Sequence, residues 1–267
     1  MASVLSIVAR GPSDEFTWAG APLSDVRAPC IAAGCYIVVI LTLERLMRAR
    51  GRGFDTKWLQ VAHNLILCLG SLAMALGTAV EVVRRSLAET DSSPWFGRWL
   101  YCEDPQTVPR GALWYWSYVY YLSKYYELLD TVLQLLKGRP PPHFFLHAYH
   151  HAVVLLMAWF WLEYVQTLQF IGLLFNTSVH VVMYYYYFRR VLGWDVWWKK
   201  YVTQFQIVQF GCSALMYCVT LALLSQGEPC AGSRTLVFNF VFNMTLLYQF
   251  VGVLGGGKKQ SKDAKQI

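Results

Sequence analysis

Residues 144–162 read FFLHAYHHAVVLLMAWFWL, an apolar segment of the length that crosses a lipid bilayer as a helix. The segment carries three histidines, His147, His150 and His151, and the helical period places them within about 100° of one another on one face. Ionisable side chains inside a bilayer are costly, so they normally face a cavity or a partner. The segment therefore predicts a membrane helix that carries a reaction or metal centre.

Further apolar stretches extend this interpretation to the whole chain. The 267 residues are 56% hydrophobic and 15% charged, which is less charge than a soluble domain of this length carries. We expect an all-α, polytopic membrane protein with one domain over residues 1–267. Seven transmembrane helices are predicted, at residues 29–47, 58–83, 111–136, 144–162, 165–188, 202–224 and 236–255.

Loop charges orient these spans. Lysine and arginine concentrate in the loops after the first, third and fifth spans and in the tail. The positive-inside rule places those loops in the cytosol, with residues 1–28 on the lumenal side and a flexible cytosolic tail at 255–267. The net charge of +7 then indicates a lipid bilayer surface and anionic ligands as partners, and no nucleic acid.

The cysteines agree with this orientation. Five of the seven lie in apolar spans, whereas Cys102 and Cys230 lie in loops assigned to the oxidising lumenal side. We predict a disulfide between these two residues.

Three other spans carry polar residues at helical spacing. In the third, Lys124, Glu127 and Thr131 form a stripe with Asp130 further round the helix. An alternative is that Lys124 and Glu127 only neutralise each other. The remaining sets, in the fifth and sixth spans, could equally be hydrogen-bonding contacts between helices. They are Asn176, His180, Met183 and Tyr187, and Thr203, Gln206 and Gln209.

His63 in the second span lies outside these polar stripes. We expect it to be structural or to lie at an interface.

Together these sets resemble the very-long-chain fatty-acid elongase (ELO) family, whose signatures are similar to KxxExxDT, HxxHH, NxxxHxxMYxYY and TxxQxxQ. All four are complete here, at residues 124–131, 147–151, 176–187 and 203–209. The resemblance implies condensation of a long-chain acyl-CoA with malonyl-CoA to a 3-ketoacyl-CoA, CoA and CO2. It also implies a six-helix barrel around an acyl tunnel, with the first span outside, in the endoplasmic reticulum membrane. At the tail, Asp263 stands where the family's dilysine signal has a lysine.

The residues suit this chemistry without a cofactor or a metal. No cysteine lies beside the histidine motifs, and a neutral imidazole can act as nucleophile. We expect His150 to be the nucleophile or else the base, with His180 as proton carrier or enolate stabiliser. Asn176 would donate to the oxyanion, and His147 and His151 would orient the site while Asp130 or Glu127 fixes a histidine tautomer. The candidate substrate-binding residues, some of them for CoA phosphates, are Lys124, Tyr187, Gln206, Gln209, Lys137, Arg139, Arg189 and Arg190.

Two alternatives remain at this stage. A membrane di-iron desaturase or hydroxylase also uses HxxHH, but the six histidines of this chain are fewer than such sites need. A seven-span receptor or transporter would explain the topology and leave the polar stripes unexplained. Candidate protein partners are the ketoacyl reductase, dehydratase and enoyl reductase of the elongation cycle and a second copy of the chain. Tyr149, the short chain and the lysine-rich tail resemble microalgal members that elongate polyunsaturated chains.

Overall fold

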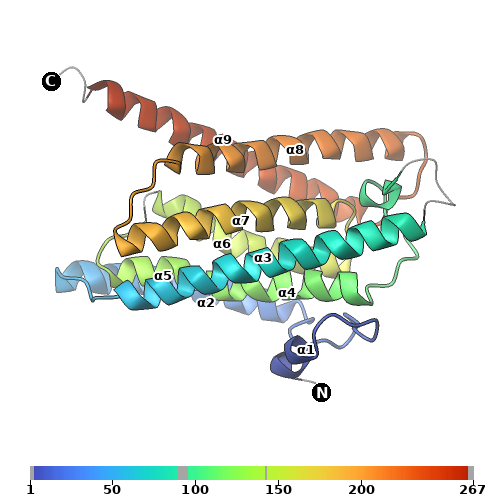
Figure 1. Ribbon diagram of the computed structural model, residues 1–267, viewed down its shortest axis with the longest axis horizontal. Coiled ribbons are helices and arrows are strands. Elements are labelled where there is room, and N and C mark those ends of the chain that lie inside the picture. The colour runs from blue at the N-terminus through green and yellow to red at the C-terminus, as the bar shows by residue number, and fades with distance from the viewer. Residues whose placement is uncertain (1–2, 90–95, 142, 264–267) are drawn as a thin grey trace.

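The computed structural model describes residues 3–89, 96–141 and 143–263, with side chains described up to residue 252. Within these ranges the chain forms helices, no strand and one isolated bridge between Thr17 and Arg110 (Figure 1). The helices are α1 (Val4–Arg10), α2 (Arg27–Arg50), α3 (Lys57–Ala88), η2 (Arg98–Leu100), α4 (Ala112–Glu127), α5 (Leu129–Leu136), α6 (Phe144–Glu163), α7 (Gln169–Leu192), α8 (Lys199–Ser225) and α9 (Ser233–Asp263).

Every predicted span overlaps helix, although the fifth was placed four residues too early because α7 begins only at Gln169, and five helices are long and apolar enough to cross a membrane. These five are α2, α3, α6, α8 and the part of α9 at Ser233–Gly252, so the chain is a multi-pass membrane protein. The continuous helix predicted over 111–136 is wrong at one point. The helix is divided at Leu128, whose N–H bonds to the carbonyl of Tyr125 only three residues back. α9 also runs on to Asp263, past the start of the predicted tail.

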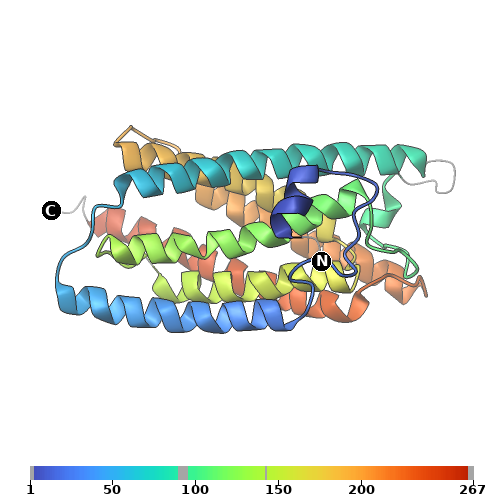
Figure 2. The ribbon, with the colours of Figure 1, turned by 90° about the horizontal axis from the view of Figure 1, so that it is seen from below.

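The helices pack around one another in a closed circuit. Contacts lead from α3 to α4, α6, α9, α8 and α7, and from α7 back to α3. Helix α2 stays outside this circuit and packs against α5 and α6 (Figure 2). The α3–α4 contact is close, because a Cβ at Gly77 would overlap the ring of Trp116.

We call the end of the bundle that carries Cys102 and Cys230 the disulfide end, and the opposite end, where α9 finishes, the tail end (Figure 1). The predicted disulfide is present, with 4.7 Å between the two Cα atoms. Beside it, the Arg85 guanidinium makes two hydrogen bonds of 2.7 Å to the buried Glu103 carboxylate. The Ala231 N–H, next to Cys230, donates to the Glu103 carbonyl (2.8 Å). One covalent and several polar links therefore hold this end together.

Residues 3–26, expected only to be a lumenal N-terminus, pack against α4 and α6 at the disulfide end. The hydroxyls of Tyr118 and Tyr121 donate to the carbonyls of Pro22 and Leu23, at 3.1 and 3.0 Å. The Trp159 indole donates to the Ser24 carbonyl at 2.7 Å, and that of Trp18 to the Glu163 carboxylate at 2.9 Å. The segment is thus part of the packed structure.

Candidate active site

A cavity of about 920 Å³ opens inside the helix circuit toward the tail end. Its wall includes the cytosol-assigned loop residue Lys137 and extends inward to Gln209 and Phe210 of α8. All seven residues expected to be catalytic line it, so the polar stripes of separate helices face one space. They are Glu127 of α4, Asp130 of α5, His147, His150 and His151 of α6, and Asn176 and His180 of α7.

The three histidines of α6 stand together in this wall. The ring centroid of His151 lies 5.3 Å from that of His150 and 6.3 Å from that of His147. His150 also stacks on Phe242 of α9, at 6.2 Å between centroids. In the described structure the Nδ1 atoms of all three are buried without a hydrogen-bond partner. Since buried polar atoms normally have partners, these nitrogens remain available to a ligand.

Lys124 lies behind the cavity wall, so the structure does not place it as a direct substrate contact. Its ammonium is 2.8 Å from Glu127 Oε1 and donates to Asn176 Oδ1 at 3.1 Å. Tyr120 donates to the same amide oxygen at 2.9 Å. An ammonium can only donate, so the Asn176 oxygen is held toward α4. Neither of the two amide N–H groups of Asn176 takes part in these bonds, which suits a donor role.

The two acidic residues contact different imidazoles. Glu127 Oε1 is 3.6 Å from His180 Nδ1, in addition to its contact with Lys124. Asp130 Oδ1 is 2.8 Å from Nε2 of His63, and its Oδ2 accepts from the Tyr184 hydroxyl at 2.7 Å. The closest imidazole to Asp130 is therefore His63, which the sequence analysis did not assign to the site.

The expected substrate-binding residues divide into two groups. Arg189 lies apart from the cavity, with its guanidinium over the rings of Trp194 and Trp198 and donating to the Asp195 carbonyl. Arg139 is also absent from the cavity wall. The residues that do line the cavity are Tyr187, Gln206, Gln209, Lys137 and Arg190, joined by Lys199.

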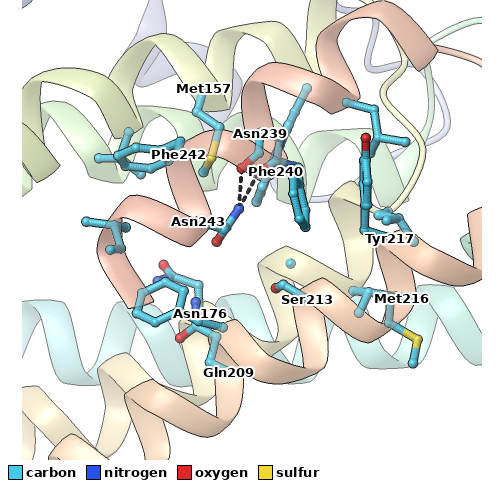
Figure 3. Close-up of a pocket in the computed structure, with 18 of the residues that line it drawn as sticks. Met157, Asn176, Gln209, Ser213, Met216, Tyr217, Asn239, Phe240, Phe242 and Asn243 are labelled. Carbon is cyan, nitrogen blue, oxygen red and sulfur yellow. Dashed lines mark hydrogen bonds between the residues drawn. The ribbon is translucent and has the colours of Figure 1, made fainter. Parts of the chain in front are cut away.

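A second, narrow pocket of about 50 Å³ adjoins the cavity (Figure 3). The two spaces share the wall residues His150, Asn176, Gln209 and Phe210. Beyond them the narrow pocket is lined mainly by apolar side chains, among them Met157, Trp161, Met216, Phe240 and Leu246. Figure 3 also shows polar groups in this wall, namely Ser213 and the bonds from Asn243 Nδ2 to the backbone carbonyl and Oδ1 of Asn239. The residues of α9 that line the narrow pocket belong to none of the four sequence motifs, so they could not be recognised from the sequence.

In the described part of the chain, no three side chains of histidine, cysteine, aspartate or glutamate gather in a way that could hold a metal ion.

Comparisons with known proteins agree with the four motifs. Residues 21–254 match the family model described as "ELO: GNS1/SUR4 family". A Dictyostelium discoideum protein named as a putative fatty acid elongase is 37% identical over 240 residues, covering 88% of this chain and 77% of its own. Fatty acid elongase sre1 of the same organism is 35% identical, covering 73% and 71%. Very long chain fatty acid elongase 2 of Mus musculus is 33% identical, covering 70% and 63%. The chain belongs to the ELO (GNS1/SUR4) family of fatty acid elongases.

Proposed function

We propose that this chain is the condensing enzyme of fatty-acid elongation, a 3-oxoacyl-CoA synthase that joins an acyl-CoA to malonyl-CoA. One observation carries the proposal: His150 stands where a wide cavity, whose wall carries charged side chains and histidines, meets a narrow pocket whose wall carries no charged side chain. An acyl-CoA matches this arrangement, because its thioester joins an apolar acyl chain to the charged CoA group. Family membership favours elongation over the di-iron alternative.

The acyl chain would occupy the narrow pocket and CoA the wide cavity. Burial of methylene groups against Met157, Met216 and Phe240 stabilises an acyl chain by roughly 0.8 kcal/mol for each group. The CoA phosphates would meet the cations in the cavity wall, which are Lys137, Arg190 and Lys199.

The first half-reaction is attack of an imidazole nitrogen of His150 on the thioester carbonyl. A C–N bond forms and the C–S bond breaks, the proton on the other nitrogen of His150 passes to His180, and His180 delivers a proton to the departing CoA sulfur, which leaves a neutral acyl-imidazole. In the second half-reaction malonyl-CoA loses CO2, and the electron pair left behind attacks the acyl carbonyl. The Asn176 amide donates to the developing oxyanion, and the C–N bond then breaks as His150 takes up one proton from solvent through His180 and returns to neutral imidazole.

Neither half-reaction changes the oxidation state of a carbon in a way that requires a redox partner. We therefore propose that the enzyme works with acyl-CoA and malonyl-CoA alone, without a cofactor or metal.

The proposed topology has seven spans, with six forming a barrel and α2 outside it. The closed circuit of helix contacts supports the barrel. The disulfide supports an oxidising compartment at its end of the bundle, which makes that end lumenal and the C-terminus cytosolic in the endoplasmic reticulum membrane. A homodimer and the other enzymes of the cycle remain proposed partners.

The test is the reaction of purified protein with a panel of acyl-CoAs, first without and then with labelled malonyl-CoA. We expect stoichiometric CoA release and a hydroxylamine-labile acyl-enzyme before malonyl-CoA is added, and ping-pong kinetics in the full reaction. If CoA appears only after malonyl-CoA, condensation is direct and the acyl-imidazole step is wrong. If malonyl-CoA never yields CO2 and a 3-ketoacyl-CoA, the proposed function is wrong.

A further inference from the structure

His63 is the one histidine of the cavity wall inside α3, and the proposed reaction gives it no part. Its side chain is 5% exposed, and its Nε2 atom is 2.8 Å from Asp130 Oδ1. An ionised carboxylate only accepts hydrogen bonds, so the proton of this bond belongs to the imidazole. The ring also packs on Tyr126, with 4.9 Å between centroids. His63 is therefore held in one orientation by a carboxylate on one side and a ring on the other.

The second oxygen of Asp130 points to the site. Oδ2 accepts from the Tyr184 hydroxyl at 2.7 Å and lies 3.9 Å from His151 Nε2. Tyr184 in turn meets the ring of His180 edge-on, at 5.2 Å between centroids. The Asp130 carboxylate thus links His63 of α3 to residues of α6 and α7. If this carboxylate rotated, its contacts with Tyr184 and His151 would both change.

The two carboxylates of the site differ in how they are held. Glu127 is 2.8 Å from the ammonium of Lys124, which fixes it on its own helix. Among the described side chains no lysine or arginine forms an ion pair with Asp130, and its nitrogen partners are His63 and, further away, His151. His63 and the Tyr184 hydroxyl consequently hold the orientation of Asp130, with one hydrogen bond to each carboxylate oxygen.

We propose that His63 is a positioning residue for the condensation. Its Nε2–H anchors Oδ1 of Asp130, so that Oδ2 stays aimed at Tyr184 and His151 while the acyl group is transferred. This inference rests on the proposed function, because it concerns the same site.

The experiment compares His63→Leu, which removes the hydrogen bond, with His63→Gln, whose amide N–H reaches about as far as the imidazole Nε2. Displacement of a catalytic group by about 1 Å can cost roughly 100-fold in rate. We expect His63→Leu to lower kcat about 10- to 100-fold with KM for acyl-CoA changed less than about 3-fold. His63→Gln should regain most of kcat. Ser71→Ala, a buried site two turns along α3 and outside both cavities, is the matched control and should retain kcat.

A double-mutant cycle separates positioning from helix packing. If His63 acts through Asp130, then His63→Leu combined with Asp130→Asn should have the same kcat as Asp130→Asn alone. If the double variant loses kcat by the product of the two single losses, His63 does not act through Asp130 and the proposal is overturned. A lowered melting temperature with unchanged kcat per folded molecule would show a structural role and would also overturn it. Wild-type kcat in His63→Leu would overturn it as well.

Should His63→Leu not fold, His63→Gln and His63→Asn carry the test, since the shorter amide cannot reach Asp130. Equal kcat in these two variants would overturn the proposal. Failure of the proposed function is a separate result, because it would appear as absent malonyl-CoA-dependent CO2 release in the wild type.

Discussion

The two ends of the bundle are built from polar residues used in opposite ways. At the disulfide end, several polar groups are paired: Arg85 with Glu103, and the Tyr118 and Tyr121 hydroxyls with backbone carbonyls, although the side-chain amide of Gln166 has no partner in the described structure. In the cavity nearer the tail end, the Nδ1 atoms of His147, His150 and His151 are buried and have no partner among the described atoms. Paired polar groups stabilise a fold, whereas buried polar groups without a partner lower its stability.

The contrast predicts that stability depends mainly on one end of the bundle and activity mainly on the other. Substitutions at the disulfide end should lower the free energy of unfolding and leave the turnover of folded molecules unchanged. Substitutions in the cavity wall should lower the turnover and leave the free energy of unfolding nearly unchanged.

The largest effect is expected from His150→Ala. Loss of the nucleophile should lower kcat/KM by roughly 1,000-fold or more and abolish early CoA release. The melting temperature should change little, because the His150 Nδ1 atom leaves no hydrogen bond behind. Val153→Ala on the same helix, outside both cavities, is the control and should remain active. If an acyl-enzyme still accumulates in His150→Ala, another residue is the nucleophile.

A smaller effect is expected from Cys102→Ser combined with Cys230→Ser. The disulfide closes a loop with a sequence separation of 128 residues. In the chain-entropy model, its loss lowers the free energy of unfolding by about 2–5 kcal/mol. Unfolding in detergent measures this effect, with Cys35→Ser, an exposed free cysteine of α2, as the control. Should kcat fall while the unfolding free energy stays constant, the division between the two ends is wrong.

The smallest effect is expected from Trp18→Phe. The substitution keeps a ring in the core but removes the 2.9 Å donor to the Glu163 carboxylate. Glu163 is exposed, so water can replace the lost donor, and the substitution should cost only about 0.5–1.5 kcal/mol of stability without changing kcat. Trp58→Phe, at an exposed tryptophan of α3, should cost nothing measurable in the same unfolding assay. Equal stability of both variants would mean that residues 3–26 are not part of the packed end.

The helices could be predicted from the sequence because a run of about 20 apolar residues has few alternatives in a bilayer. The grouping of His150, His180 and Asn176 was also predictable, since each lies on a polar stripe that would be unfavourable against lipid. The break at Leu128 was not, because neither glycine nor proline marks it.

The position of His63 beside Asp130 was not predictable for another reason. The two residues are 67 positions apart, on helices whose relative rotation no sequence period specifies. The packing of residues 3–26 escaped prediction because its acceptors at Pro22, Leu23 and Ser24 are backbone carbonyls, which every residue possesses. Sequence patterns report which face of a helix is polar, and tertiary pairing decides which groups meet.

The contacts of residues 3–26 also impose an order on biosynthesis. Ser24 leaves the ribosome 135 residues before its partner Trp159, and Pro22 leaves it 96 residues before Tyr118. At roughly 5–20 residues per second, residues 22–24 wait on the order of ten seconds for the helices they contact. During that interval their carbonyls are solvated and the tyrosine and tryptophan donors do not yet exist. The segment therefore cannot take its packed position until α4 and α6 have been made, and removing it would leave the donors of these two helices without their acceptors.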